Sequence, residues 1–195
     1  MNMVDSPINE GRAVVRALGA DDLTLYRIHT GNLGFVEDSI RAMGDLTLLP
    51  PLAKSYMPYP RIGRLVNFGF WIEFADAFVG LTLLCVSSWD NHHGFTTTHI
   101  AEPRRGMGFA PRTKPHLFHL GFAILGLNRI EAGCGISNSS SNRSIRKTPG
   151  FVFEGRLREY VLRTDGKYED ENRYAILRRD WLELYDSSSV SVIVD

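Results

Sequence analysis

The sequence predicts a mixed α/β fold, in which helices flank a mostly antiparallel central sheet. Three strand-like runs, at residues 64–74, 77–89 and 95–101, follow one another with only short turns between them. This spacing is typical of meander strands. Helix-like and strand-like segments then alternate between residues 114 and 150. Meander strands followed by such alternation favour a mixed sheet covered by helices.

The length and composition are those of a globular protein with a full core. The chain has 195 residues, of which 44% are hydrophobic and 23% are charged. We expect a single domain over residues 11–185, because no linker-like segment interrupts it. Residues 1–10 are predicted to be a flexible tail. Residues 186–195 form a C-terminal tail that is either disordered or adds an edge strand.

Charge and cysteine usage exclude several classes of protein. Lys and Arg together number 22, as do Asp and Glu, so the net charge is zero. This balance argues against broad binding to nucleic acid or to a membrane surface. Cys85 and Cys134 lie in apolar runs and are expected to be buried free thiols. Neither a signal peptide nor a bilayer-length apolar run is evident, which makes the cytoplasm the expected location.

The first third of the chain is predicted to hold one strand and two helices. Residues 13–18 are rich in β-formers and predict a strand. A pair of aspartates opens residues 19–32 and predicts a helix, and loosely helical spacing predicts another over 33–44. Four prolines within 48–63 predict a loop or a broken helix.

The second half is predicted to alternate helices and strands and to end in a hairpin. A helix is expected over 114–128, a strand over 129–136 and a short helix within 137–150. Two strand-like runs fill 151–181, and Thr164, Asp165 and Gly166 between them are a hairpin signal.

The glycine-rich stretch 104–115, RRGMGFAPRTKP, lies between a predicted strand and a predicted helix. Backbone N–H groups of such a turn, together with the positive end of the helix, favour a bound anion. Gly106 and Gly108 allow close approach of a phosphate because they lack a Cβ atom. Additional positive charge comes from Arg104, Arg105 and Arg112.

Other phosphate and metal sites fit this stretch less well. No Gly-Lys-Ser/Thr follows the turn, which excludes the phosphate loop of ATPases. No strand–helix–strand unit with a suitably spaced acid supports a dinucleotide site. His92 and His93 are adjacent and lack further ligands at metal-binding spacing, so no metal site is expected.

Four segments match, in order and in spacing, motifs that recur together in one enzyme family. The turn at 105–110 has the pattern Arg or Gln, two residues, Gly, one residue, Gly or Ala. Residues 125–133, LGLNRIEAG, are similar to the segment of that family in which a helix ends and the next strand begins. Asn138 and Ser141 form an Asn-x-x-Ser motif. The ending 146–181 carries Lys, Gly-Phe, Glu-Gly and an Asp-Gly-Lys-Tyr hairpin.

Over residues 94–181 the chain thus resembles the GCN5-related N-acetyltransferases (GNAT), and within them the branch of ribosomal-protein N-terminal acetyltransferases. The resemblance implies a sheet that splays open where acetyl-CoA enters, with acetyl-CoA as cosubstrate and no metal. It implies that Ile100 and Ala101 lie beside the pantetheine arm, and that Asn138 bonds this arm or orders the helix after it. The pyrophosphate would be held by the backbone of Arg105, Gly106, Met107, Gly108, Phe109 and Ala110.

The implied reaction is acetyl transfer to an amine, which needs an oxyanion donor, a proton acceptor and a proton for the leaving thiolate. N–H groups near Ile100 and Ala101 are the expected oxyanion donors. Ser141 is the candidate donor to the thiolate. His99 and Glu131 are both candidates for the general base, and the sequence does not choose between them.

The chain departs from the family pattern in three places. Pro111 and Pro115 follow the turn, and Pro115 implies a helix that starts late or has a distorted first turn. Thr148 and Pro149 add one residue before Gly-Phe. The tyrosine that many family members use as the thiolate's acid is absent, as it often is in this branch. These departures leave a non-catalytic relative that binds CoA or a protein as the alternative to an enzyme.

The acceptor is expected to be a protein N-terminal amine or a small-molecule amine such as a polyamine, an amino acid or an antibiotic. Residues 20–65 would select it, with Tyr56, Met57 and Tyr59 as candidate pocket residues. The resemblance allows a monomer or a homodimer.

Overall fold

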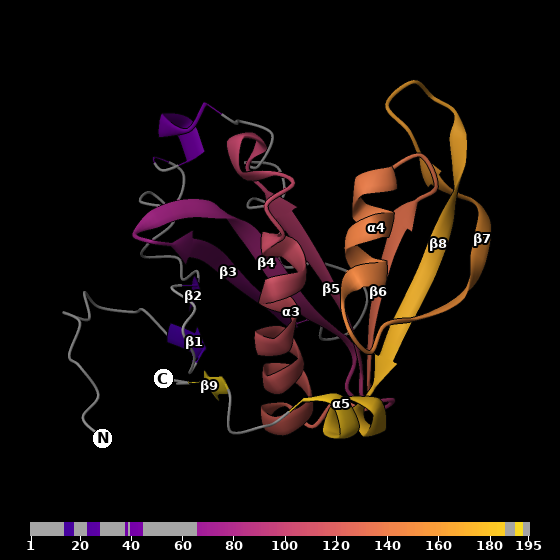
Figure 1. The fold of residues 1–195 in the computed structure, drawn as a ribbon. Coiled ribbons are helices and arrows are strands. Elements are labelled where there is room, and N and C mark those ends of the chain that lie inside the picture. Colours follow the sequence, from indigo (N-terminus) through magenta and orange to yellow (C-terminus); the bar gives the residue numbers. More distant parts are fainter. Residues whose placement is uncertain are drawn as a thin grey trace, which may run out of the picture.

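The fold is built on one large twisted sheet (Figure 1). The computed structural model describes residues 14–17, 23–27, 38, 40–44, 66–185 and 190–192. Within these residues, the strands are ordered β7-β8-β6-β5-β4-β3-β2-β1-β9. All neighbours are antiparallel except β5 and β6. The strands are β1 Val14–Ala17, β2 Leu23–Arg27, β3 Val66–Phe74, β4 Ala77–Ser88, β5 His93–Ile100, β6 Arg129–Gly135, β7 Val152–Leu162, β8 Tyr168–Leu177 and β9 Val190–Val192.

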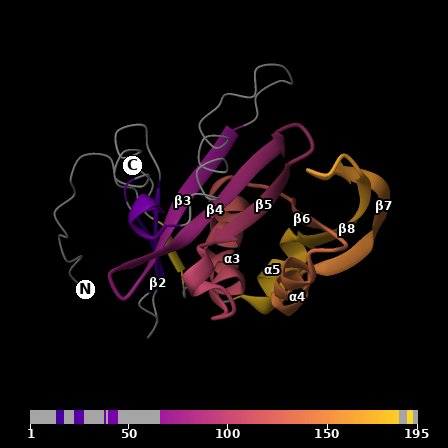
Figure 2. The same ribbon diagram turned by 90° about the horizontal axis from the view of Figure 1, so that it is seen from above.

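Three α-helices lie on the same side of this sheet (Figure 2). They are α3 Phe109–His119, α4 Ser139–Lys147 and α5 Arg178–Leu184. A 3₁₀ turn, η3 Glu102–Arg104, precedes α3, and a π-helical turn, η4 Leu120–Ile124, continues it. No helix in the described part of the chain is long and apolar enough to cross a membrane.

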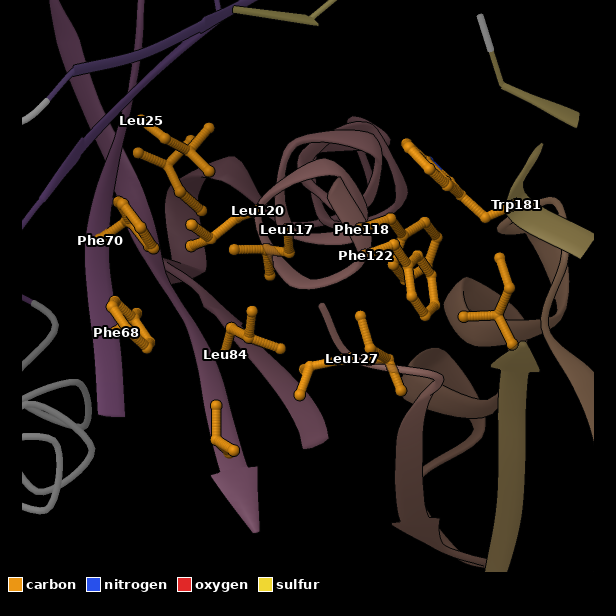
Figure 3. Close-up of a cluster of buried hydrophobic side chains, with 14 of the residues drawn as sticks. Leu25, Phe68, Phe70, Leu84, Leu117, Phe118, Leu120, Phe122, Leu127 and Trp181 are labelled. Carbon is orange, nitrogen blue, oxygen red and sulfur yellow. The ribbon is translucent and has the colours of Figure 1, made fainter. Parts of the chain in front are cut away.

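The main core lies between α3 and the strands beneath it (Figure 3). Leu117 and Phe118 of α3 are fully buried, as is Leu84 of β4. Trp181 of α5 closes the core at the other end of the helix, where its ring lies 5.6 Å from that of Phe122. Burial of each large apolar side chain contributes about 1.5–3 kcal/mol to the free energy of folding. The core therefore holds α3, and the turn that precedes it, in a fixed position on the sheet.

The predicted fold class is confirmed, and most of the predicted elements occur. The structure shows the strand near residue 14, the three-strand meander, the strand–helix pair β6–α4 and the β7–β8 hairpin. Residues 40–42 are helical and Gly44 follows at φ +72°, as predicted for the end of that helix. The C-terminal tail adds an edge strand, because β9 pairs with β1.

Two element predictions were wrong. Residues 23–27 form strand β2 where a helix was predicted. Leu23 and Leu25 are both buried, so the apolar period here is two, and the preceding aspartates do not start a helix. The short helix α5 was missed, since only its Trp181 is buried and its first turn is closed by Asp180 accepting from the Leu177 N–H.

The helix after the glycine turn also starts earlier than predicted. It begins at Phe109 and continues through Pro115, so it does not start late, and its first turn is already α-helical. Pro111 occupies the third helical position, where an N–H has no intrahelical partner to lose. Pro115 removes a single hydrogen bond from a helix whose inner face is buried. The predicted tail 1–10, the proline-rich loop 48–63 and its candidate pocket residues lie outside the described part of the chain.

Candidate functional site

The central feature of the site is a pair of strands that separate. β5 and β6 run parallel and pair over only three positions, His93 with Arg129, Gly94 with Ile130 and Phe95 with Glu131. Beyond them, residues 96–100 and 132–135 continue without pairing to each other. Figure 1 shows the two strands diverging, with α3 and α4 both beginning at the open end.

The backbone of β5 offers hydrogen-bonding groups to this opening. In an antiparallel ladder, alternate residues direct both their N–H and C=O groups at the same neighbour. Ala101 N–H donates to Val79 O of β4 at 2.9 Å. The alternation therefore turns the backbone groups of Ile100 away from β4 and toward the opening. Of the two predicted oxyanion donors, the Ala101 amide is already used, whereas that of Ile100 faces the space between the strands.

The glycine turn adopts the conformation that an anion cradle needs. Gly106 and Gly108 both have φ of +80°, a region that residues with a Cβ atom rarely occupy. A Cβ atom at either position would meet nothing within 4 Å. Gly108 caps α3 without a side-chain hydrogen bond, so the first N–H groups of the helix have no side-chain cap. Met107 is 57% exposed at the tip of the turn.

Two of the three arginines at the turn are held in place by neighbouring groups. Arg105 Nε donates to the carbonyl of Ile100 at 3.0 Å, which links the turn back to the end of β5. The Arg112 guanidinium lies over the rings of Phe74 and Phe109, at 5.0 and 5.2 Å from their centroids. These contacts keep two fixed positive charges beside the uncapped helix start.

The Asn-x-x-Ser motif forms the start of α4, on the other side of the opening. Asn138 Oδ1 accepts from Ser141 N–H at 3.0 Å and so caps the helix, which is the ordering role considered for it. The Ser141 hydroxyl lies against Cys134 of β6. Burial raises the pKa of the Cys134 thiol, and the hydrogen bond from Ser141 opposes this rise.

The two candidate bases lie apart. Glu131 sits where β5 and β6 are still paired, and its carboxylate contacts Arg129 at 2.8 Å and Arg173 at 3.6 Å. His99 lies four residues beyond Phe95, about 13 Å along the strand, and its Nε2 is 3.5 Å from Thr97 Oγ1. Both carboxylate oxygens of Glu131 are engaged by arginines, whereas His99 stands nearer the open end.

The sequence reasoning missed a buried lysine on α3. Lys114 is 5% exposed, and its Nζ donates to Thr96 Oγ1 at 3.0 Å and to Thr98 Oγ1 at 2.8 Å. No carboxylate in the described part of the chain pairs with it. Burial lowers the pKa of Lys114 to about 7. The signal available in the sequence was a lysine within an apolar helix face, whereas the threonines opposite it are brought there by the fold.

Several solved structures with the same architecture are acetyltransferases. Spermidine N-acetyltransferase from Vibrio cholerae, in complex with CoA and spermine, matches with a TM-score of 0.63 and 23% identity over 83% of this chain and 98% of that one. A chimera of this enzyme with hSSAT matches with a TM-score of 0.65 and 23% identity over 83% and 99% of the two chains. The chain has the GNAT acetyltransferase fold.

A further GNAT structure, the dodecameric form of the Vibrio cholerae enzyme, matches with a TM-score of 0.63 and 23% identity over 85% of this chain and 99% of that one. No family profile matches the chain, and neither does any curated protein. No three His, Cys, Asp or Glu residues among those described are grouped to hold a metal ion.

Proposed function

We propose that this protein is an acetyl-CoA-dependent N-acetyltransferase that acts on an amine. The observation that carries the proposal is the opening between β5 and β6, with the uncapped start of α3 at its mouth. The glycine turn would hold the pyrophosphate of acetyl-CoA on its N–H groups. The pantetheine arm would lie between the strands, beside the Ile100 N–H that is turned away from β4.

The chain supplies groups for each step of acetyl transfer. The acceptor nitrogen attacks the thioester carbonyl, and the Ile100 N–H would stabilise the resulting oxyanion. The C–S bond then breaks, and the Ser141 hydroxyl would donate its proton or a hydrogen bond to the CoA thiolate. The ammonium proton passes to a base, for which His99 is favoured over the doubly paired Glu131.

A small-molecule amine is the first acceptor class to test. The similar enzyme was solved with spermine, a polyamine. A protein N-terminal amine is the other acceptor that the sequence resemblance implies. Both present a primary amine, so the same chemistry serves either one.

Calorimetry with acetyl-CoA tests the binding half of this proposal. We expect micromolar binding of acetyl-CoA and no comparable binding of ATP, because the pantetheine arm and not the nucleotide fills the strand opening. Thiol release is then followed with spermine, with an N-terminal peptide and without an acceptor. Binding without release for any amine would favour the non-catalytic relative, and absence of binding would contradict the proposal.

Ser141→Ala is expected to lower kcat about 10- to 100-fold and to leave the KM for acetyl-CoA nearly unchanged. The variant removes the proposed donor to the thiolate but keeps the backbone N–H that Asn138 caps. Ser140→Ala is the matched control, since Ser140 also bonds Asn138 but lies on a more exposed face. Equal activity of both variants would remove Ser141 from the mechanism.

A further inference from the structure

A polar groove lies between α4 and the β7–β8 hairpin. It is an open groove of about 500 Å³, within the range of about 300–1,000 Å³ that small-molecule sites occupy. Four of its lining side chains are cationic and none is acidic. The lining residues include Asn142, Arg143, Arg146 and Lys147 from α4, Arg156 from β7 and Asn172 from β8.

Two of the groove's arginines are oriented by neutral groups. Arg146 Nε donates to the hydroxyl of Tyr174 at 3.2 Å, and Arg156 Nε donates to Asn172 Oδ1 at 3.3 Å. Neither bond uses the terminal nitrogens of the guanidinium, and no carboxylate in the described part of the chain pairs with Arg146 or Arg156. By contrast, Arg129, Arg163 and Arg173 each pair with a carboxylate.

A buried amide fixes the groups that hold these arginines. Asn142 is 8% exposed, and its Oδ1 accepts from Asn172 Nδ2 at 2.7 Å and from the Tyr174 hydroxyl at 3.0 Å. Its Nδ2 donates to the carbonyls of Gly135 and Asn138. All four hydrogen-bonding positions of this amide are thus used. The network therefore sets the direction of both guanidinium groups before any ligand arrives.

The groove is separate from the glycine turn. Helix α4 lies between α3 on one side and the β7–β8 hairpin on the other in both views (Figures 1 and 2). Arg143 and Arg146 line the groove from the hairpin side of α4, whereas Ser141 faces Cys134 of β6. A ligand in this groove would not occupy the turn at Gly106 and Gly108.

We propose that the groove binds a small molecule bearing a multiply charged phosphate group, distinct from the acetyl-CoA cosubstrate. Guanidinium groups form paired hydrogen bonds with phosphate oxygens, and two such groups face the groove with their terminal nitrogens available. Arg143 and Lys147 add two further charges at its rim. Four cations without an acid select a ligand with several negative charges over a neutral or cationic one. This inference does not depend on acetyl transfer.

Tripolyphosphate titrated by calorimetry at low salt is the direct test. The wild type is compared with Arg146→Gln/Arg156→Gln and with Arg158→Gln, which removes the same charge from β7 outside the groove. Gly108→Val is added because the turn is the other phosphate-binding candidate. We expect the double variant to bind tripolyphosphate at the groove about tenfold or more weakly, and Arg158→Gln to bind it as the wild type does. Gly108→Val should keep the groove's binding step and lose at most a separate step at the turn. Circular dichroism and the single variants Arg146→Gln and Arg156→Gln check that any loss is not due to misfolding.

Three results would overturn the proposal. In the first, tripolyphosphate does not bind the wild type, or binds the double variant equally well. In the second, Gly108→Val alone abolishes binding, which places the phosphate at the turn. In the third, CoA displaces tripolyphosphate whereas dephospho-CoA does not, which gives the groove to the cosubstrate's own 3′-phosphate. Normal acetyl-CoA affinity of the double variant, with lost tripolyphosphate binding, separates this site from the proposed acetyltransferase site.

Discussion

Lys114→Met is expected to stabilise the folded protein at pH 6.5 by roughly 2–4 kcal/mol. The wild-type lysine is buried without a described carboxylate partner, and burial lowers its pKa from 10.5 to about 7. At pH 6.5 folding must therefore bury a charge or remove its proton. Methionine has a similar volume and no charge, and it gives up only two hydrogen bonds to threonine hydroxyls.

The hydrogen bonds around Lys114 favour the neutral amine. Thr82 Oγ1 donates to Thr97 O, so the bond between Thr82 and Thr98 uses the proton of Thr98. Thr96 Oγ1 donates to the carbonyl of Leu83. Both hydroxyls that face Nζ can therefore only accept, and an NH₂ group has the two protons that they need. The third proton of an ammonium finds no acceptor in the described part of the chain.

The sign of the pH dependence follows from these states. Between pH 7 and 10.5 the unfolded lysine holds a proton that the folded one has lost, so the stability rises with pH in this window. The slope from this residue is at most about 1.4 kcal/mol per pH unit. Below pH 7 both states are protonated and the cost is fully present.

Urea unfolding at pH 6.5, 7.5 and 8.5 measures the effect. The advantage of Lys114→Met over the wild type should shrink as the pH rises, and comparing the two proteins cancels the contribution of other groups. Lys167→Met, at an exposed position in the hairpin, is the control and should show no such trend. A constant difference between wild type and Lys114→Met across the three pH values would contradict a neutral buried amine.

Lys114 also illustrates what sequence patterns convey and what they miss. The strands β3 to β5 could be predicted because their apolar and β-branched residues are bounded by turn signals. Strand β2 was not, since Leu23 and Leu25 fit either period over so few residues. The buried position of Lys114 depends on Thr96 and Thr98 facing α3, which is a tertiary relation that no local window contains.

The candidate site also combines features that local sequence patterns reveal with features that depend on the tertiary structure. The turn around Gly106 and Gly108 was recognisable because positive φ values demand glycine, and their spacing is local. Which amide of β5 remains available depends on the register with β4, in which Val79 accepts from Ala101. That register is set by pairing across the sheet. One of the two ion pairs that engage Glu131 likewise comes from a residue 42 positions later, Arg173, brought close by β8.

Gly108→Val is expected to abolish acetyl-CoA binding and to lower stability by roughly 1–3 kcal/mol. A β-branched residue tolerates a φ of +80° poorly. Because a Cβ atom at position 108 meets no neighbour, the stability loss comes from this backbone strain and not from a steric clash. The binding loss has a different cause, because the added methyl groups would occupy the space above the helix N–H groups where the pyrophosphate is proposed to lie.

Gly166→Val separates these two causes. Gly166 has φ of +79° in the hairpin between β7 and β8, and a Cβ atom there also meets nothing within 4 Å. The backbone strain of the two variants should therefore be similar, and their melting temperatures should fall by comparable amounts. Calorimetry should show unchanged acetyl-CoA affinity for Gly166→Val and none for Gly108→Val. If both variants kept their affinity, the turn would not be the phosphate cradle, and acetyl-CoA would have to enter the sheet opening by contacts other than the start of α3.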